Sequence, residues 1–393
     1  MLTFPHRPGI PLSQASYWSN RLSHIILSCP RCGRTRPADM SVDVCSDCAA
    51  PLDVEYTTDH KPSGQSGAYE ARTPVINPSS GVSLGEGGTP SVELQVLGES
   101  LGIRHLHGKL EFLNPTGSFK DRGTAVMLSV AMERGVAELV EDSSGNAGAS
   151  VSAYAARAGI KAHVFVPADA PQAKLRQIRV YGSEVHPIEG TRDAVTAAAK
   201  DFHRQHGLVY ASHMLSPYFA EGTKTFAYEV ARQFDGALPG HIVFPVGNGS
   251  LFIGAYKGFC ELKAAGIIDD IPRLHCVQAR SVMPLVAAFT DQSWDAGAAS
   301  RTVAGGIAIA APSRQEQILD ILRLVDGTAV AVEESNIVQM QQNLAEQEGV
   351  FAEPTSAAAF AGLDEIMKQG VILGNDTVLV PVTGFGLKDE APL

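Results

Sequence analysis

Short apolar runs alternate with helical patterns along most of the chain after residue 80. Three of these runs are rich in β-branched residues and predict buried strands: 161–167 (KAHVFVP), 241–246 (HIVFPV) and 378–382 (VLVPV). Helical patterns flank the first run at 148–158 and 172–181. Strands that alternate with helices are typical of parallel sheets covered on both faces, so the pattern predicts an α/β fold.

Residues 1–56 carry little apolar periodicity and predict a small unit of their own. Its four cysteines form a C-x2-C-x12-C-x2-C arrangement made of Cys29, Cys32, Cys45 and Cys48. Two such turns can supply the four tetrahedral thiolate ligands that zinc prefers, so we expect a structural zinc or iron site. The alternative is that the cysteines are buried without metal. The following stretch, 57–75, is rich in Pro, Ser and Gly and predicts a linker.

Composition narrows the classes of function. The 393 residues are 45% hydrophobic and carry a net charge of −11, without a run of Lys or Arg that could follow a phosphate backbone. Nucleic-acid binding is therefore not expected. We find no signal peptide and no stretch of about 18 apolar residues, so no membrane span is expected. Four of the six cysteines form two close pairs, which suits metal ligation better than a set of disulfide bonds. This usage fits a reducing compartment, so the cytoplasm is the expected location.

Three predicted junctions of strand, loop and helix have unusual glycine and polar content. The first is 113–123 (LNPTGSFKDRG), in which a turn-forming Asn-Pro-Thr-Gly leads into a helix with Lys120 in its first turn. A lysine there opposes the helix dipole, which favours a functional reason for its position. Taken alone, the residue could equally be an ordinary surface lysine.

The other two junctions have the form of anion-binding loops. In 142–150 (DSSGNAGAS), Ser143 or Ser144 is expected to cap a helix whose free N–H groups face a ligand such as a substrate carboxylate. In 246–251 (VGNGSL), a glycine-rich loop leads from a strand into a helix at 252–264, as in a phosphate cradle. Neither a dinucleotide fingerprint nor a P-loop is present. Each loop alone is also ordinary turn chemistry.

Together the three junctions resemble the fold type II pyridoxal-phosphate enzymes and, within them, the threonine synthase family. The run 114–123 (NPTGSFKDRG) is the most specific match, and further matches lie at 85–90 (GEGGTP), 353–358 (EPTSAA) and 383–389 (TGFGLKD). The resemblance covers about residues 75–390. It implies a carbon–oxygen lyase that converts O-phosphohomoserine to threonine and phosphate.

The resemblance also implies roles for individual residues. Lys120 would carry the cofactor as a Schiff base and then move the substrate α-proton. Asn146 would hydrogen-bond the ring O3′, and Thr383 would face the pyridine nitrogen with a hydroxyl, which suits eliminations better than transamination. Asp121 and Arg122 would hold the helix of the lysine in place. The remaining implied cofactor contacts are Phe119, Gly247, Asn248, Gly249, Ser250 and Leu251. The implied substrate contacts are Ser143, Ser144, Ala147 and Gly148.

The implied architecture has two α/β lobes with parallel-rich sheets and the cofactor between them. We expect the large lobe to combine 76–120 with 215–393, and the small lobe to span 121–214. Each implied contact follows a strand's carboxyl end, where open α/β sheets bind ligands. A zinc-ribbon-like unit would precede the lobes, and a homodimer is the usual state of the family.

One segment departs from the family pattern. The family commonly places an arginine, suited to a substrate phosphate, just before an E-G-x-K-T segment. Here 216–225 reads SPYFAEGTKT, and Phe219 stands near that position with only His213 and Lys224 as basic residues nearby. Burying a phosphate beside a phenyl ring without a cation would be costly. A related β-elimination or β-replacement enzyme, similar to cysteate synthase or the ammonia-lyases, is therefore an open alternative. Another is a zinc-ribbon interaction protein on a decayed enzyme scaffold, against which the intact cofactor motifs argue.

Overall fold

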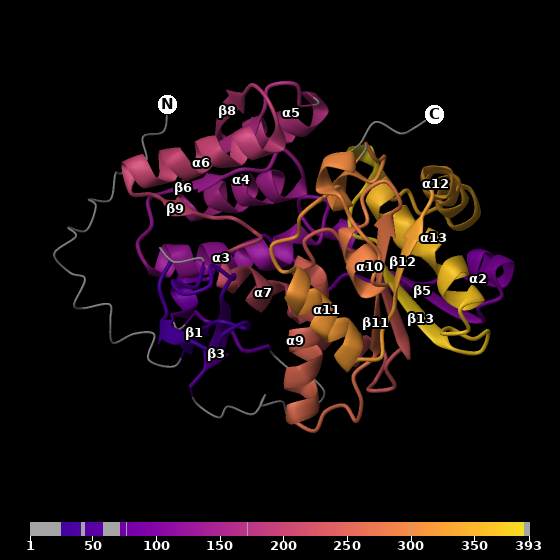
Figure 1. Ribbon diagram of the computed structural model, residues 1–393. Helices are drawn as coiled ribbons and strands as arrows, with labels where there is room; N and C mark the ends of the chain where they lie inside the picture. Colours follow the sequence, from indigo (N-terminus) through magenta and orange to yellow (C-terminus); the bar gives the residue numbers. More distant parts are fainter. Residues whose placement is uncertain are drawn as a thin grey trace.

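The chain forms two α/β bodies side by side and a small unit of antiparallel strands packed against them (Figure 1). The computed structural model describes residues 25–40, 44–57, 71–75, 77–170, 172–299 and 301–388. The predicted linker lies largely outside the described residues, as do the first 24 residues of the cysteine-bearing unit. Among the described helices, none is both long enough and apolar enough to cross a membrane.

The largest sheet has six strands in the order β12-β11-β10-β13-β5-β4. The strands are β4 (Ser91–Glu93), β5 (His105–Lys109), β10 (His241–Pro245), β11 (Arg273–Ala279), β12 (Ala329–Val332) and β13 (Thr377–Pro381). Only β4 runs antiparallel to its neighbour. Successive residues of β10 enter different cores, Val243 on one face and Phe244 on the other, so the sheet is buried on both sides.

Helices cover both faces of this sheet (Figure 1). They are α2 (Gln95–Leu101), α8 (Thr225–Gln233), α9 (Ser250–Ala264), α10 (Pro284–Phe289), α11 (Gln315–Leu324), α12 (Glu334–Glu348) and α13 (Pro354–Lys368). Helix α13 contributes Phe360 to the same core as Val243, whereas α9 contributes Phe252 to the core of Phe244. The two cores fix the sheet between them and so hold the loops at its carboxyl edge.

The second sheet has four parallel strands in the order β8-β7-β6-β9. They are β6 (Glu138–Glu141), β7 (Lys161–Pro167), β8 (Glu184–Ile188) and β9 (Val209–Tyr210). The accompanying helices are α3 (Lys120–Glu133), α4 (Asn146–Ala158), α5 (Gln172–Val180), α6 (Arg192–His206) and α7 (Pro217–Thr223). These findings confirm the predicted fold class, a parallel-rich α/β protein with two sheets, while the lobe boundaries stay a prediction.

The cysteine-bearing unit folds as a three-stranded antiparallel sheet in the order β2-β1-β3. Its strands are β1 (Ile25–Ser28), β2 (Thr35–Pro37) and β3 (Asp53–Tyr56). The unit is tied to the body at two places: Tyr56 Oη donates to Glu221 Oε2 at 2.5 Å, and Arg314 Nη1 lies 2.7 Å from Asp53 Oδ1. It is therefore docked on the body rather than separate from it.

Two helices begin earlier than the sequence pattern predicts. Helix α4 begins at Asn146, and α9 begins at Ser250, directly after Gly249 in the left-handed conformation with φ of 75°. A glycine adopts that conformation without steric cost, so the loop after β10 can turn sharply into its helix. In the loop after β6, neither serine caps α4: Gly145 occupies the cap position, and Ser143 Oγ accepts from the backbone N–H of Gly145 at 3.2 Å.

Candidate active site

A cavity of about 1220 Å³ opens between the two α/β bodies. Its wall includes the loops that follow β6, β10 and β13, each at the carboxyl end of its strand. Pockets for small molecules commonly occupy about 300–1,000 Å³, so this cavity has room for a cofactor together with a substrate. The structure thus brings all three predicted junctions to one place.

Lys120 lies at the first position of α3 with its ammonium directed into the cavity region. Its Nζ atom lies 3.5 Å from Ser250 Oγ and 4.6 Å from the ring centre of Phe119. Burial lowers the pKa of Lys120 to about 8, although the charges of Glu141 and Glu353 act in the opposite direction. A lysine with a lowered pKa is readily available as a neutral nucleophile.

Buried polar contacts anchor the helix that carries this lysine. Asp121 accepts from the backbone N–H and the hydroxyl of Thr116, both at 2.6 Å, and from Ser150 Oγ at 2.6 Å. Arg122 donates to Glu111 at 2.7 Å and to Glu229 at 2.7 Å. Each member of these networks is paired, as buried polar groups need to be, so the first turn of α3 is held in one position.

The loop Gly247–Leu251 has the features of a phosphate cradle. Asn248 Oδ1 is buried and lacks a hydrogen-bond partner among the described residues, which fits a contact with a bound group. A Cβ atom on Gly247 would lie 3.0 Å from Ile307 Cα, so a larger residue would press on that segment. The loop leads into the N-terminus of the 15-residue helix α9, where free backbone N–H groups favour an anion. These residues fit the phosphate of pyridoxal phosphate.

Asn146 and Thr383 face the cavity from opposite bodies. Asn146 Nδ2 donates to Glu353 Oε2 at 3.0 Å. Thr383 Oγ1 lies 2.9 Å from Ser356 Oγ, which also accepts from the backbone N–H of Gly384 at 3.1 Å. A hydroxyl at this position carries no charge that would hold a pyridine nitrogen protonated.

A buried carboxyl group beside the cavity escaped the sequence reasoning. Glu141 ends β6 with its side chain fully buried, and its Oε1 lies 3.3 Å from Nδ1 of His213, which lines the cavity. The second oxygen, Oε2, lacks a partner among the described residues. Burial raises the pKa of Glu141 well above its ordinary value, and the charge of Asp142 adds to this. Burial and the charge of Lys120 lower the pKa of His213 well below its ordinary value.

These opposite shifts favour the uncharged forms of both partners. In those forms the proton lies on the Glu141 carboxyl, which can donate it to His213 Nδ1 at the cavity wall. The sequence signal that could have found the carboxyl is its place as the last strand residue before the 142–150 motif. An acid at that position of a buried strand needs an explanation.

Phe219 lies beside Lys120, whose Nζ is 5.7 Å from the centre of the Phe219 ring, whereas Lys224 points away from the cavity. Phe219 is buried behind α3, with its ring 2.4 Å from the position that a Cβ atom on Gly123 would occupy. The Lys224 ammonium is buried between Glu221 at 2.7 Å and Glu261 at 2.8 Å. Neither residue lines the cavity, so Lys224 is excluded as a phosphate contact, because tertiary packing points it away.

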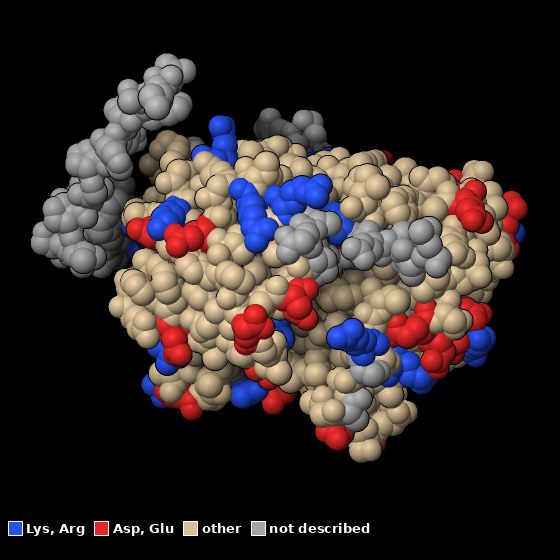
Figure 2. Space-filling view, turned by 90° about the horizontal axis from the view of Figure 1, so that it is seen from above, with Lys and Arg blue, Asp and Glu red and all other residues tan. Residues whose placement is uncertain are grey.

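Other basic residues do line the cavity. The cavity wall contains Arg176, Arg192, Lys200 and Lys388, none of which the sequence analysis singled out. The Arg192 guanidinium lies 3.0 Å from Asp142, and Lys388 Nζ donates to the carbonyl of Thr116 at 2.7 Å. Figure 2 shows basic side chains on both sides of the hollow in the upper face of the molecule. The wall can therefore attract an anionic substrate group.

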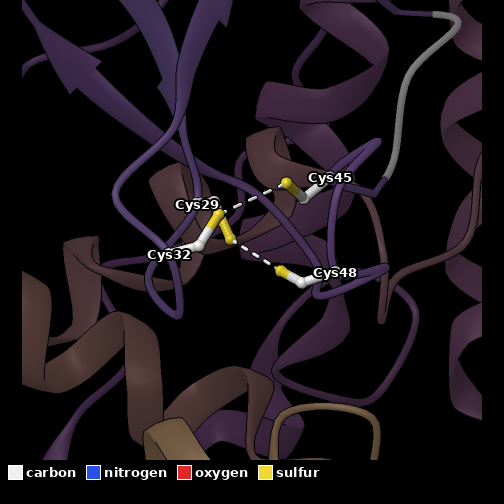
Figure 3. A group of neighbouring side chains, drawn as sticks. All are labelled: Cys29, Cys32, Cys45 and Cys48. Atoms are coloured by element: carbon white, nitrogen blue, oxygen red, sulfur yellow. Dashed lines mark hydrogen bonds between the residues drawn. The ribbon is translucent and has the colours of Figure 1, made fainter.

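The four cysteines converge outside the cavity (Figure 3). Cys29 Sγ lies 3.5 Å from Cys48 Sγ, and Cys32 Sγ lies 3.6 Å from Cys45 Sγ. A tetrahedral zinc shell with metal–sulfur distances near 2.3 Å puts neighbouring sulfurs about 3.8 Å apart. The cluster fits a metal with four thiolate ligands.

Comparisons with known proteins agree with this geometry. A family model described as "Pyridoxal-phosphate dependent enzyme" matches residues 82–384. Threonine synthase from Methanocaldococcus jannaschii is 35% identical over 375 residues, which covers 92% of both chains. Threonine synthase from Methanosarcina acetivorans is 36% identical over 382 residues, again 92% of both chains.

A solved structure shares the fold. A fungal L-serine ammonia-lyase from Rhizomucor miehei superposes with a TM-score of 0.67 at 22% identity, covering 76% of this chain and 94% of that chain. At this identity the likeness concerns the fold alone.

Proposed function

Because the chain belongs to the threonine synthase family of pyridoxal-phosphate-dependent enzymes, we propose that it converts O-phosphohomoserine to threonine and inorganic phosphate. The family resemblance drawn from the motifs is confirmed by relatives at about 35% identity over most of the chain. The protein is a pyridoxal-phosphate enzyme of the carbon–oxygen lyase type, so the reading as a decayed scaffold is set aside.

Pyridoxal phosphate, when bound, supplies an electron sink that stabilises negative charge at the substrate Cα. The residues that would hold it are Lys120, Phe119, Asn146, Thr383 and the loop Gly247–Leu251. Lys120 as a neutral amine would form the covalent link and then take the Cα proton. The observation that carries this proposal is the distance of 3.5 Å between Lys120 Nζ and Ser250 Oγ, which joins the predicted lysine to the predicted phosphate loop.

Substrate would be held at its two anionic ends. Its carboxylate would meet the N-terminus of α4, where the loop Ser143–Gly148 presents backbone N–H groups. Its phosphate would face the basic wall that includes Arg176, Arg192 and Lys200. A proton on the Glu141 carboxyl would reach a group in the cavity through His213, because His213 lines the wall.

The experiment is a coupled assay of purified holoenzyme with O-phosphohomoserine, measuring phosphate and threonine together. Equal release of both products at a physiological rate supports the proposal. A parallel panel of serine- and threonine-type substrates is assayed for ammonia and α-keto acid.

The second candidate is a related β-elimination or β-replacement enzyme acting on another amino acid. It is favoured by one observation: Phe219, where the family pattern has an arginine, is buried behind α3 and offers no charge to a substrate. Clear elimination from the panel, without turnover of O-phosphohomoserine, would select this candidate.

We infer further that the four cysteines bind one structural zinc ion, since their sulfur separations match a tetrahedral shell and four thiolates leave no open position. The two-lobe division at 121–214, a homodimeric state and a cytoplasmic location stay predictions. Elemental analysis of gently purified protein tests the zinc site. The size of the protein in solution tests the homodimeric state.

A further inference from the structure

A second group of metal-binding side chains lies on the four-stranded sheet, away from the cavity. Its members are His163 on β7 and Glu184 and His186 on the edge strand β8. His163 is paired with Glu184 in the parallel register, and His186 follows two residues later. Side chains two residues apart on a strand share a face, so all three lie on the same side of the sheet.

The donor atoms of this group are spaced for a shared ion. His163 Nδ1 lies 3.1 Å from His186 Nε2 and 3.6 Å from Glu184 Oε2, and His186 Nε2 lies 3.7 Å from Glu184 Oε1. Metal–nitrogen distances of about 2.0–2.1 Å in a tetrahedral shell put neighbouring ligand nitrogens about 3.3 Å apart. Little movement would be needed to place one ion between the three.

The surroundings fix the two rings. Glu138 Oε2 accepts from Nε2 of His163 at 2.9 Å, which leaves the Nδ1 lone pair directed at His186. The His186 ring is stacked on Phe165 with ring centres 4.5 Å apart, and the centre of the Phe202 ring lies 5.3 Å from that of His186. Metal-binding histidines usually donate their other ring N–H to a carboxylate or carbonyl, as His163 does here.

We propose that His163, Glu184 and His186 bind a divalent transition metal such as zinc, with Glu138 as the supporting carboxylate and a remaining position open to water. None of these residues lines the cavity, and His163 lies near the amino end of its strand, whereas the cavity is at the carboxyl ends. The ion would pin the edge strand β8 to β7. This inference is independent of the proposed reaction.

Lys161 provides a test that separates a metal site from a hydrogen-bonded network without metal. Its ammonium lies 3.1 Å from Glu184 Oε2 and 3.6 Å from Glu138 Oε2, on a side chain that is 52% exposed. A positive charge beside the site opposes a metal cation, and the lysine must swing aside when the ion binds. Removing this charge should therefore strengthen metal binding, a gain that a hydrogen-bonded network without a metal function would not produce.

The experiment is zinc calorimetry on full-length holoenzyme whose zinc content has first been measured, so that metal on the cysteines is counted separately. We expect one further zinc per chain, lost in His186→Ala and retained in the control His105→Ala, a half-exposed histidine beside Glu93. Glu138→Gln should weaken binding by about tenfold or more. Lys161→Met should tighten it severalfold.

Cobalt in place of zinc identifies the ligands. Nitrogen and oxygen ligands give weak d–d bands, whereas thiolates add an intense charge-transfer band, so the spectrum separates this site from the four cysteines. Zinc should also raise the Tm of the wild type but not of His186→Ala. The proposal is overturned if the wild type takes up no zinc beyond the cysteine-bound ion, or if His186→Ala and Lys161→Met both titrate like the wild type.

Discussion

Glu141 Oε1 lies 3.3 Å from Nδ1 of His213, so the last residue of β6 reaches a histidine of the cavity wall from behind. The ionisable groups around this pair are Lys120, Asp142, Arg192 and Tyr210. Because the pKa of Glu141 is raised and the pKa of His213 is lowered, the uncharged forms of both partners are favoured. This arrangement makes the pair the most informative target for mutation near the cofactor site.

Glu141→Gln should lower kcat by about a hundredfold if the proton of the Glu141 carboxyl is used in turnover, the size of a typical general acid–base contribution. A merely structural Glu141 would leave the pH profile of kcat unchanged in shape. Glu141→Asp, which keeps a carboxyl group, should restore part of the rate. Steady-state kinetics across pH for all three proteins provide the measurement.

The same substitution should alter the pH dependence of stability. Glu141 has a folded pKa above its unfolded value, so its protonated form stabilises the fold at low pH, and this contribution is lost as pH rises toward the folded pKa. Glutamine does not titrate. The difference in free energy of unfolding between the two proteins should therefore move in favour of Glu141→Gln as pH rises from 4 to 8. Denaturant unfolding at both pH values provides the measurement. An equal difference in free energy of unfolding at pH 4 and pH 8 would contradict a buried acid at residue 141.

Lys120→Ala should abolish turnover and the covalent attachment of the cofactor while the fold persists, because the residue lies at the first turn of a helix held by other contacts. Borohydride reduction followed by peptide mapping identifies the modified lysine. Lys263→Ala, a half-exposed lysine outside the cavity, serves as the matched control. A tag on any lysine other than 120 would refute the assignment.

Cofactor uptake by the stripped protein should accelerate as pH rises and level off above about pH 8. The free amine is the nucleophile, and burial lowers the pKa of Lys120 to about 8 rather than its ordinary 10.5. Stopped-flow absorbance after mixing with pyridoxal phosphate follows this step. A rate that still climbs steeply at pH 10 would show that the lysine is not perturbed.

Gly123→Ala should destabilise the protein by several kcal/mol, because the new methyl would meet the Phe219 ring at 2.4 Å. Phe219→Leu in the same chain should recover part of that loss, since it removes the obstructing ring. Gly240→Ala, whose nearest neighbour lies 4.0 Å away, should be tolerated. Denaturant unfolding of the wild type, Gly123→Ala, Phe219→Leu and the double variant completes the double-mutant cycle, and additive effects would argue against direct packing.

Three strands of the two large sheets could be predicted from the sequence. The run 161–167 matches β7 residue for residue, because a short β-branched segment between helices has few other structures open to it. Helix starts were less accurate. Backbone conformations at Gly145 and Gly249 let α4 and α9 begin two residues early, and no side-chain pattern marks those conformations.

The cavity wall was harder to predict for a physical reason. The lysine and the glycine-rich loops are local motifs, so their resemblance to a known family could be seen in the sequence. The partnership of Glu141 with His213 joins residues 72 positions apart, and it exists only because β6 and the segment after β9 meet in the fold. Lys224 shows the converse case. It is close in sequence to the motif around Phe219 and was therefore considered as a phosphate contact, but in the fold it belongs to a buried ion cluster.

That cluster determines how far the cysteine-bearing unit can be treated as a detachable module. Glu221 receives Tyr56 from β3 on one side and pairs with Lys224 and Lys257 on the other, all in the interior. A chain cut before residue 71 would open these charges to water and remove the phenol that covers them, so the catalytic body alone would have to rebuild part of its own surface. The N-terminal unit is thus tied to the catalytic body through Glu221, and exchanging it between relatives would require exchanging its counterpart around Glu221 as well.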